Sequence, residues 1–138
     1  MTFHIPSHWR VFVLDDTEER LCWFRERVPK MRSAKTAEAA LEILAAEQFD
    51  LIFLDHDLSW EDAGFPDRQH GNGKEVARFL ARTGFAGRVV IHSKNEDGVK
   101  AMARLLPAAT IERFGDFDIA ESAGKNEKHW NQNRTYPS

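Results

Sequence analysis

The segment LIFLDHDL, residues 51–58, decides how this chain folds. Its four apolar residues are followed directly by Asp55, His56 and Asp57. A short apolar run that stops abruptly is typical of a strand buried on both faces, as in a parallel sheet. Similar runs are WRVFVL at 9–14, RVVI at 88–91 and the weaker ATIERF at 109–114, and a short extended piece lies at 31–34. We therefore expect five strands.

Segments of helical periodicity separate these runs. In each of them apolar residues recur at spacings of three and four, which places them on one face of a helix. The expected helices span residues 17–28, 36–44, 73–82 and 97–106. Strands and helices that alternate in this way are typical of an α/β fold with a doubly wound sheet. We predict a five-stranded parallel sheet in the order 2-1-3-4-5, with helices on both faces.

Composition narrows the class of protein further. The chain has 138 residues, of which 42% are hydrophobic and 30% charged, as is usual for one soluble globular domain. A net charge of −3 argues against bulk nucleic-acid binding, and no apolar run approaches the ~20 residues of a membrane span. The first residues do not resemble a secretory signal, and the lone Cys22 excludes an internal disulfide. We expect a cytoplasmic protein without membrane partners.

Composition also divides the chain into three parts. Residues 1–8 form an N-terminal lead-in, 9–114 carry the alternating strands and helices, and 115–138 are a polar extension with at most a short helix. The stretch 58–72 is longer and richer in turn-forming residues than an ordinary connection between a strand and a helix. We therefore expect this loop to be functional or mobile.

Carboxylates follow two of the predicted strands. Asp15 and Asp16 come after the first strand, and Asp55 and Asp57 come after the third. In open α/β sheets ligands bind at the carboxyl ends of the strands where the strand order reverses, and the predicted order makes these two strands neighbours. Crowded carboxylates repel one another unless a cation is bound, and Mg²⁺ prefers oxygen ligands, with Mn²⁺ also possible. A single aspartate after a strand is often only a turn former or a helix cap, but two such pairs favour a metal site.

The blocks VFVLDDTEER, FDLIFLDHDL and VVIHS resemble the receiver domains of two-component response regulators. This resemblance covers most of the predicted domain and implies a flavodoxin-type, CheY-like fold. It also implies that Mg²⁺ is held by Asp15, Asp16, Asp55 and the backbone carbonyl of Asp57. In that family the aspartate matched by Asp55 accepts a phosphoryl group, and Ser93 matches the position of a hydroxyl-bearing site residue.

The chain departs from ordinary receivers after the fifth strand. Receivers have Lys-Pro-Phe there, whereas this chain has Glu112-Arg113-Phe114. The lysine that neutralises the phosphoryl group is therefore replaced by an acid. Lys94 and Arg113 are the two candidates for supplying the missing charge.

The LDHDL and HSKN blocks resemble a divergent group more closely, the cyclic-phosphate-processing receiver domains. This resemblance implies a metal-assisted site that acts on a phosphoester such as a cyclic phosphate. In such a site His56 and His92 are candidates for proton transfer, together with Ser93, and Lys94 and Asn95 are candidates for phosphate binding. Either histidine can instead be a packed residue with a structural role.

We therefore expect a divergent receiver-fold protein whose acidic divalent-metal pocket binds or hydrolyses a phosphoester, with a phosphate-containing small molecule as its partner. One alternative is a stand-alone receiver that accepts a phosphoryl group at Asp55 and acts on a partner signalling protein. Another is a catalytically inert pseudo-receiver that serves as an interaction module. The missing lysine counts against the first alternative, and the intact set of acids counts against the second.

Overall fold

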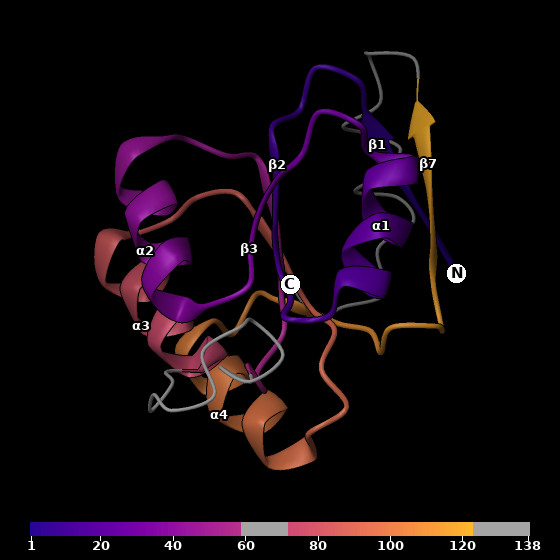
Figure 1. Ribbon diagram of the computed structural model, residues 1–138. Helices are drawn as coiled ribbons and strands as arrows, with labels where there is room; N and C mark the ends of the chain where they lie inside the picture. Colours follow the sequence, from indigo (N-terminus) through magenta and orange to yellow (C-terminus); the bar gives the residue numbers. More distant parts are fainter. Residues whose placement is uncertain (59–71, 123–138) are drawn as a thin grey trace.

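The computed structural model describes residues 1–58 and 72–122, so most of the predicted 58–72 loop and the chain from 123 onward lie outside the described residues (Figure 1). Strands and helices alternate along most of the chain. In order, the elements are β1 (Thr2–Pro6), β2 (Val11–Leu14), α1 (Glu18–Arg27), β3 (Arg32–Ala34), α2 (Ala37–Ala46), β4 (Leu51–Leu54), α3 (Gly73–Thr83), β5 (Arg88–Ile91), α4 (Glu96–Leu105), β6 (Thr110–Ile111) and β7 (Asp118–Ser122).

The main sheet has five parallel strands in the order β3-β2-β4-β5-β6. Counted along the chain without β1, this is the predicted order 2-1-3-4-5, and the prediction of a doubly wound α/β fold is confirmed. Phe12 in β2, the second strand in this order, lies opposite Arg32 of β3 on one side and Ile52 of β4 on the other. The carboxyl ends of β2 and β4 are therefore neighbours.

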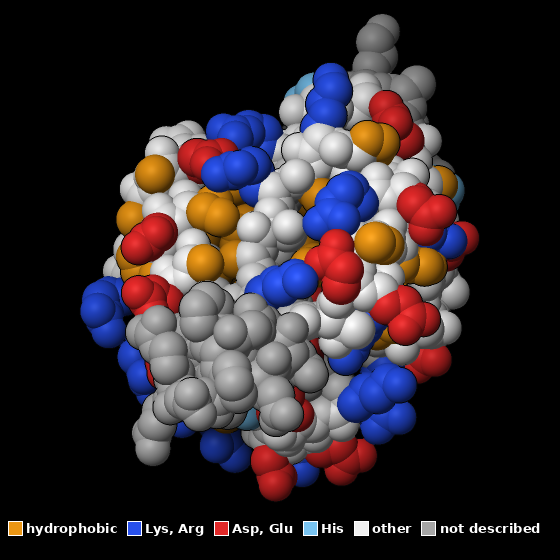
Figure 2. Space-filling model, in the orientation of Figure 1, with side chains coloured by type: hydrophobic (Ala, Val, Ile, Leu, Met, Phe, Trp, Pro, Cys, Tyr) orange, Lys and Arg blue, Asp and Glu red, His pale blue; other side chains and the backbone are white. Residues whose placement is uncertain are grey.

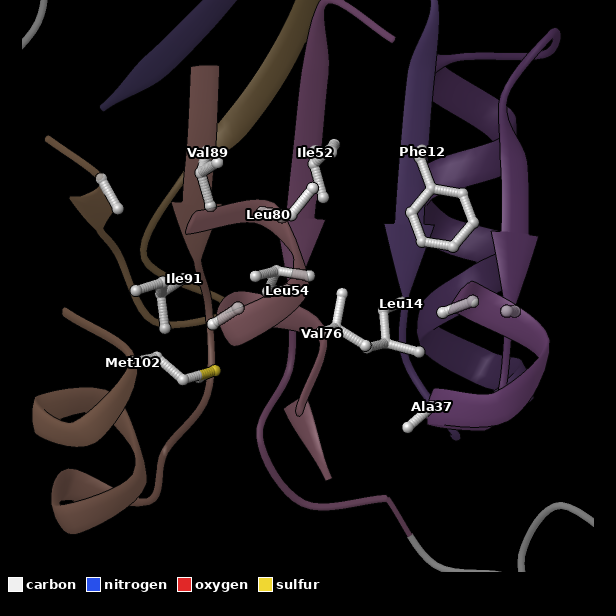
Figure 3. Packing of buried hydrophobic residues seen from close by; sticks show 14 of the residues in the cluster. Phe12, Leu14, Ala37, Ile52, Leu54, Val76, Leu80, Val89, Ile91 and Met102 are labelled. Carbon is white, nitrogen blue, oxygen red and sulfur yellow. The ribbon is translucent and has the colours of Figure 1, made fainter. Parts of the chain in front are cut away.

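One face of the sheet is covered by three helices, α2, α3 and α4 (Figure 3). All residues of β2 and β4 are buried, because successive side chains point to opposite faces and both faces are covered. Phe12, Leu14, Ile52 and Leu54 point toward the three helices. This explains why the strands have continuous apolar sequences rather than an alternating pattern.

The opposite face is covered by α1 and by a second, two-stranded parallel sheet of β1 and β7. Phe3 of β1 lies opposite Ile119 of β7, and both side chains are buried against the main sheet. The sequence analysis treated these residues as parts of a lead-in and a polar extension. Phe3 and Ile5 do alternate with polar residues, but the run is short and its pairing partner lies in a distant part of the sequence.

Asparagine caps fix the helices that begin near the carboxyl edge of the sheet. The Asn72 side chain accepts a hydrogen bond from the Lys74 amide at the start of α3, and the Asn95 side chain accepts one from the Gly98 amide at the start of α4. Helix α4 therefore begins one residue before the predicted Asp97.

None of the helices in residues 1–58 and 72–122 has the length and hydrophobicity needed to span a bilayer. On the face shown in Figure 2, acidic and basic side chains are interspersed.

Candidate functional site

Polar residues that follow three strands meet at the carboxyl edge of the main sheet. The strand pairing continues into these residues, because the Asp55 amide donates to the Leu14 carbonyl and the His92 amide donates to the Leu54 carbonyl. Continued pairing places their side chains in a fixed register. The buried polar side chains at this edge are Asp15, Asp16, Asp55, His92 and Ser93.

An open pocket of about 440 Å³ lies above these residues. It combines acidic, basic and hydroxyl side chains from the loops after β2, β4 and β5, and from the first turn of α1. The described residues that line it are Asp16, Thr17, Arg20, Asp55, His56, Asp57, Leu58, Asn72, Ser93 and Lys94. Asp15 and His92 do not belong to this lining, and both side chains are 0% exposed.

Asp15 and His92 form a buried pair beneath the pocket. Nε2 of His92 lies 2.9 Å from Oδ2 of Asp15, and the Thr17 amide donates to Oδ1 of the same carboxylate. A buried carboxylate is costly unless it is paired and hydrogen-bonded, so His92 stabilises Asp15 in this position. Among the described residues, Nδ1 of His92 has no hydrogen-bond partner. The imidazole instead lies among the rings of Phe24, Phe53 and Phe114.

The pKa of Asp55 is strongly raised. Burial raises its pKa to about 6, and the neighbouring Asp15 and Asp16 carboxylates act in the same direction. His92 and Arg20 act in the opposite direction. The carboxylate group is thus held in an environment that opposes its negative charge, and a bound cation would relieve this opposition.

The acids at this edge fit a hard divalent cation. One ligand atom from each of Asp15, Asp55 and His92 lies within 4.8 Å of the others. Nε2 of His92 is already engaged with Asp15, whereas Asp16 and Asp55 both face the pocket. Carboxylate oxygens are the donors that Mg²⁺ and Mn²⁺ prefer. Asp16 and Asp55 are therefore the residues best placed to bind a cation from the pocket, with Asp15 behind them.

A second histidine and carboxylate pair forms the rim of the pocket. Nδ1 of His56 lies 2.8 Å from Oδ1 of Asp57, and the Asn95 side-chain amide donates to the same oxygen at 3.0 Å. Asn95 also caps α4, so it joins the rim to that helix and is not part of the pocket lining. The His56 ring lies against Gly98, where an added Cβ would come within 2.3 Å of it.

Gly73, the first residue of α3, lies against the backbone that carries Asp55 and His56. Its amide donates to the His56 carbonyl, and an added Cβ would lie 2.0 Å from the Asp55 carbonyl oxygen. Only glycine allows α3 to begin this close to the backbone that carries Asp55 and His56. A glycine at the start of a predicted helix, just after a long loop, is the sequence signal for this contact.

The sequence analysis did not identify Arg20 as a residue of the site. It is located in α1, one turn after Asp16, and lines the pocket. Of the two predicted sources of positive charge, Lys94 lines the pocket, whereas the exposed Arg113 lies 3.8 Å from Glu96 and outside the lining. Glu112 follows β6 directly and is half-buried.

Comparison with family models matches most of the chain to one family. A family model described as Cyclic-phosphate processing Receiver domain matches residues 10–108. The comparison with curated proteins gave no match.

Solved structures of response regulators share the fold. The regulator TrrA of Thermotoga maritima, in complex with Mg²⁺-BeF, has 14% identity and a TM-score of 0.59, over 90% of this chain and 95% of that chain. The phosphorylated cyanobacterial phytochrome response regulator RcpA has 20% identity and a TM-score of 0.54, over 95% and 99%. The T. maritima regulator DrrB, an OmpR/PhoB homolog, has 19% identity and a TM-score of 0.58, over 78% of this chain. This chain covers only 46% of DrrB. At these identities the likeness shows the fold alone.

Proposed function

This chain belongs to the family of cyclic-phosphate processing receiver domains, and we propose that its acidic pocket binds a divalent cation and hydrolyses a phosphoester such as a cyclic phosphate. The observation that carries the proposal is the pair of buried carboxylates, Asp16 and Asp55, in a pocket that also contains basic side chains. Acids alone repel an anionic ester, whereas acids with a bound cation and nearby bases attract one.

The acids of the pocket differ in what they would do for the cation. Asp16 and Asp55 would bind it directly, together with the backbone carbonyl of Asp57, while His92 holds Asp15 in position behind them. Mg²⁺ or Mn²⁺, when bound, would polarise a phosphoryl oxygen and lower the pKa of a water molecule.

Hydrolysis of a cyclic phosphodiester also requires two proton transfers. The oxygen of a water molecule bonds to phosphorus and one phosphorus–oxygen ester bond breaks, so the water loses a proton and the leaving oxygen gains one. His56 lines the pocket, and Asp57 holds its Nδ1. We assign the proton transfers to His56. His92 is fully buried outside the lining, and we assign it the role of positioning Asp15.

Ser93 and Lys94 would contact the phosphoryl group. Both line the pocket, and the Ser93 hydroxyl accepts a hydrogen bond from the Asn95 amide, which leaves its own proton available as a donor. Lys94 is exposed and adds a positive charge at the opening. Asn95, which the sequence analysis also assigned to phosphate, acts in this proposal through Asp57 and the start of α4.

A second candidate function uses the same pocket. Asp55 and Ser93 both line the pocket and are both buried, which suits a carboxylate that accepts a phosphoryl group from a small phosphodonor. The half-buried Glu112 opposes this function, because an acid follows β6 where receivers have a lysine. We expect small phosphodonors with Mg²⁺ to give little or no base-labile mass increase on Asp55.

The direct test is a hydrolysis panel of 2′,3′-cyclic and 3′,5′-cyclic nucleotides with Mg²⁺ or Mn²⁺, in which the phosphomonoester product is separated by chromatography. We expect cation-dependent turnover of at least one ester. Asp55→Asn should abolish it, and His56→Gln should lower kcat by ~10²–10⁴-fold. Asp116→Asn, which changes an exposed acid outside the pocket, is the matched control and should not alter turnover. Turnover that survives in Asp55→Asn, or no turnover of any ester, would contradict the proposal.

A further inference from the structure

We propose that Arg20 supplies the positive charge that binds the phosphoryl group in this pocket, in place of the lysine that receivers have after their last strand. The inference rests on the proposed function and adds a residue to it. Arg20 comes from α1, which packs on one face of the main sheet, whereas Lys94 lies just before α4, which packs on the other face.

The site needs a cation beyond the metal. Three buried carboxylates lie at this edge of the sheet, since Asp16 and Asp55 line the pocket and Asp15 lies beneath it. A single divalent cation balances two of their negative charges, and a phosphodiester brings at least one more. Charges that are removed from water without a partner are costly, so an anionic ester binds well only where additional positive charge faces it.

The segment after β6 does not provide this charge. Glu112 is itself an acid, and the Arg113 guanidinium lies 3.8 Å from Glu96 on the exposed surface. Within residues 1–58 and 72–122, the lysine and arginine side chains that line the pocket are Arg20 and Lys94. The substitution of the receiver lysine is thus compensated from a different element of the fold.

Arg20 is also held in place for this role. Its Nη2 donates to the Thr17 hydroxyl at 3.2 Å, and its guanidinium carbon lies 5.7 Å from the centre of the Phe114 ring. Phe114 is anchored in turn, since its amide donates to the His92 carbonyl. The segment after β6 therefore contributes an aromatic ring that supports the cation of α1, rather than a cation of its own.

The guanidinium retains donors for an anion. Its Nε lies 3.6 Å from Oδ2 of Asp15, which is longer than a hydrogen bond, so the two groups attract each other without that donor being consumed. The side chain is 28% exposed and faces the pocket. A planar guanidinium presents paired donors that match phosphate oxygens, which the ammonium group of Lys94 does not.

Two titrations test the assignment on wild type, Arg20→Gln, Arg20→Lys and the control Arg113→Gln. Calorimetry first measures Mg²⁺ affinity, and then the affinity for inorganic phosphate at saturating Mg²⁺. We expect Arg20→Gln to bind phosphate at least tenfold more weakly, with Mg²⁺ affinity unchanged or higher because a positive charge near the acids is gone. Arg20→Lys should recover part of the phosphate affinity, and Arg113→Gln should match wild type in both titrations.

The outcomes separate this assignment from the proposed function. If Arg20→Gln binds Mg²⁺ and then phosphate as wild type does, Arg20 is only a structural partner of Asp15 and the assignment is wrong. If wild type binds no Mg²⁺, the proposed function fails, and the assignment fails with it. Melting curves of each variant verify that it is folded.

Discussion

Two histidine and carboxylate pairs lie at the same edge of the sheet, and the comparison between them explains much of the site. Asp15 and His92 are 2.9 Å apart with both side chains 0% exposed, whereas His56 and Asp57 are 2.8 Å apart with side chains 15% and 67% exposed. The contacts are nearly identical in length. Their consequences differ because burial makes an unpaired charge costly, while water can replace a partner at the surface. The buried pair therefore holds the site together, and the exposed pair can exchange its contacts with a ligand.

Removal of one partner from each pair should give the largest contrast. His92→Ala removes the hydrogen-bonded partner of Oδ2 in the buried Asp15 carboxylate, so we expect the free energy of unfolding to fall by about 3–5 kcal/mol. Asp57→Ala removes the exposed member of the rim pair and should cost about 1 kcal/mol or less. Urea unfolding of the metal-free proteins measures both. Equal losses in the two variants would show that burial does not distinguish the pairs.

Asp55 should link stability to pH in the metal-free protein. Its pKa is raised from 3.8 to about 6, so the folded state binds this proton more tightly than the unfolded state does. The resulting loss of stability is absent below about pH 4, grows between about pH 4 and 6, and is complete above that range. Asp55→Asn removes the charge and should stabilise the protein by about 3 kcal/mol at about pH 8, since each pKa unit corresponds to ~1.4 kcal/mol.

The measurement for Asp55 is chemical unfolding in the presence of a chelator at several pH values. Asp57→Asn, at the exposed rim, is the control and should show no such pH-dependent gain. A stabilisation by Asp55→Asn that is the same at about pH 4 and about pH 8 would mean that burial of the charge is not its cause.

Gly73 and Gly98, the two glycines near the rim of the pocket, should differ in how much stability an alanine substitution costs. At Gly73 an added Cβ meets the Asp55 backbone carbonyl, which cannot move without displacing the strand end, so Gly73→Ala should cost about 2–3 kcal/mol. At Gly98 the added Cβ meets the His56 ring, which can rotate, and alanine favours the helix by about 1 kcal/mol. Gly98→Ala should thus change stability by about 1 kcal/mol or less and mainly lower turnover through His56. A larger stability loss in Gly98→Ala than in Gly73→Ala would contradict this interpretation.

The sequence predicts the main sheet well because its strands are buried on both faces. A continuous apolar run as short as LIFL at 51–54, followed at once by acids, strongly favours a strand covered on both sides, and those acids mark the ligand edge. The β1–β7 sheet could not be predicted in this way, because the outer face of β1 is only partly covered and its pattern is a short alternation. Its two strands also come from distant parts of the chain, and local patterns do not report such pairing.

The site residues also differ in how far the sequence alone predicts their positions. Asp15, Asp16 and Asp55 could be brought together from the sequence, since strand order alone makes their positions neighbours. The difference between His56 and His92 depends on which way each side chain points after its strand, and the sequence does not specify this. Arg20 requires knowledge of which face of α1 borders the pocket, so residue spacing gave no reason to prefer it.

The central claim is that the acid cluster is a divalent-cation site, and the dependence of stability on Mg²⁺ tests it most directly. A ligand that binds only the folded state stabilises it by RT ln(1 + [L]/Kd), or ~1.4 kcal/mol for each tenfold rise in concentration above Kd. We predict this increase in wild type and in the control Asp116→Asn at about pH 8, and its loss in Asp55→Asn, which starts from a higher stability without metal. Unfolding free energies that do not respond to Mg²⁺ in wild type, or that rise equally in Asp55→Asn, would contradict the claim.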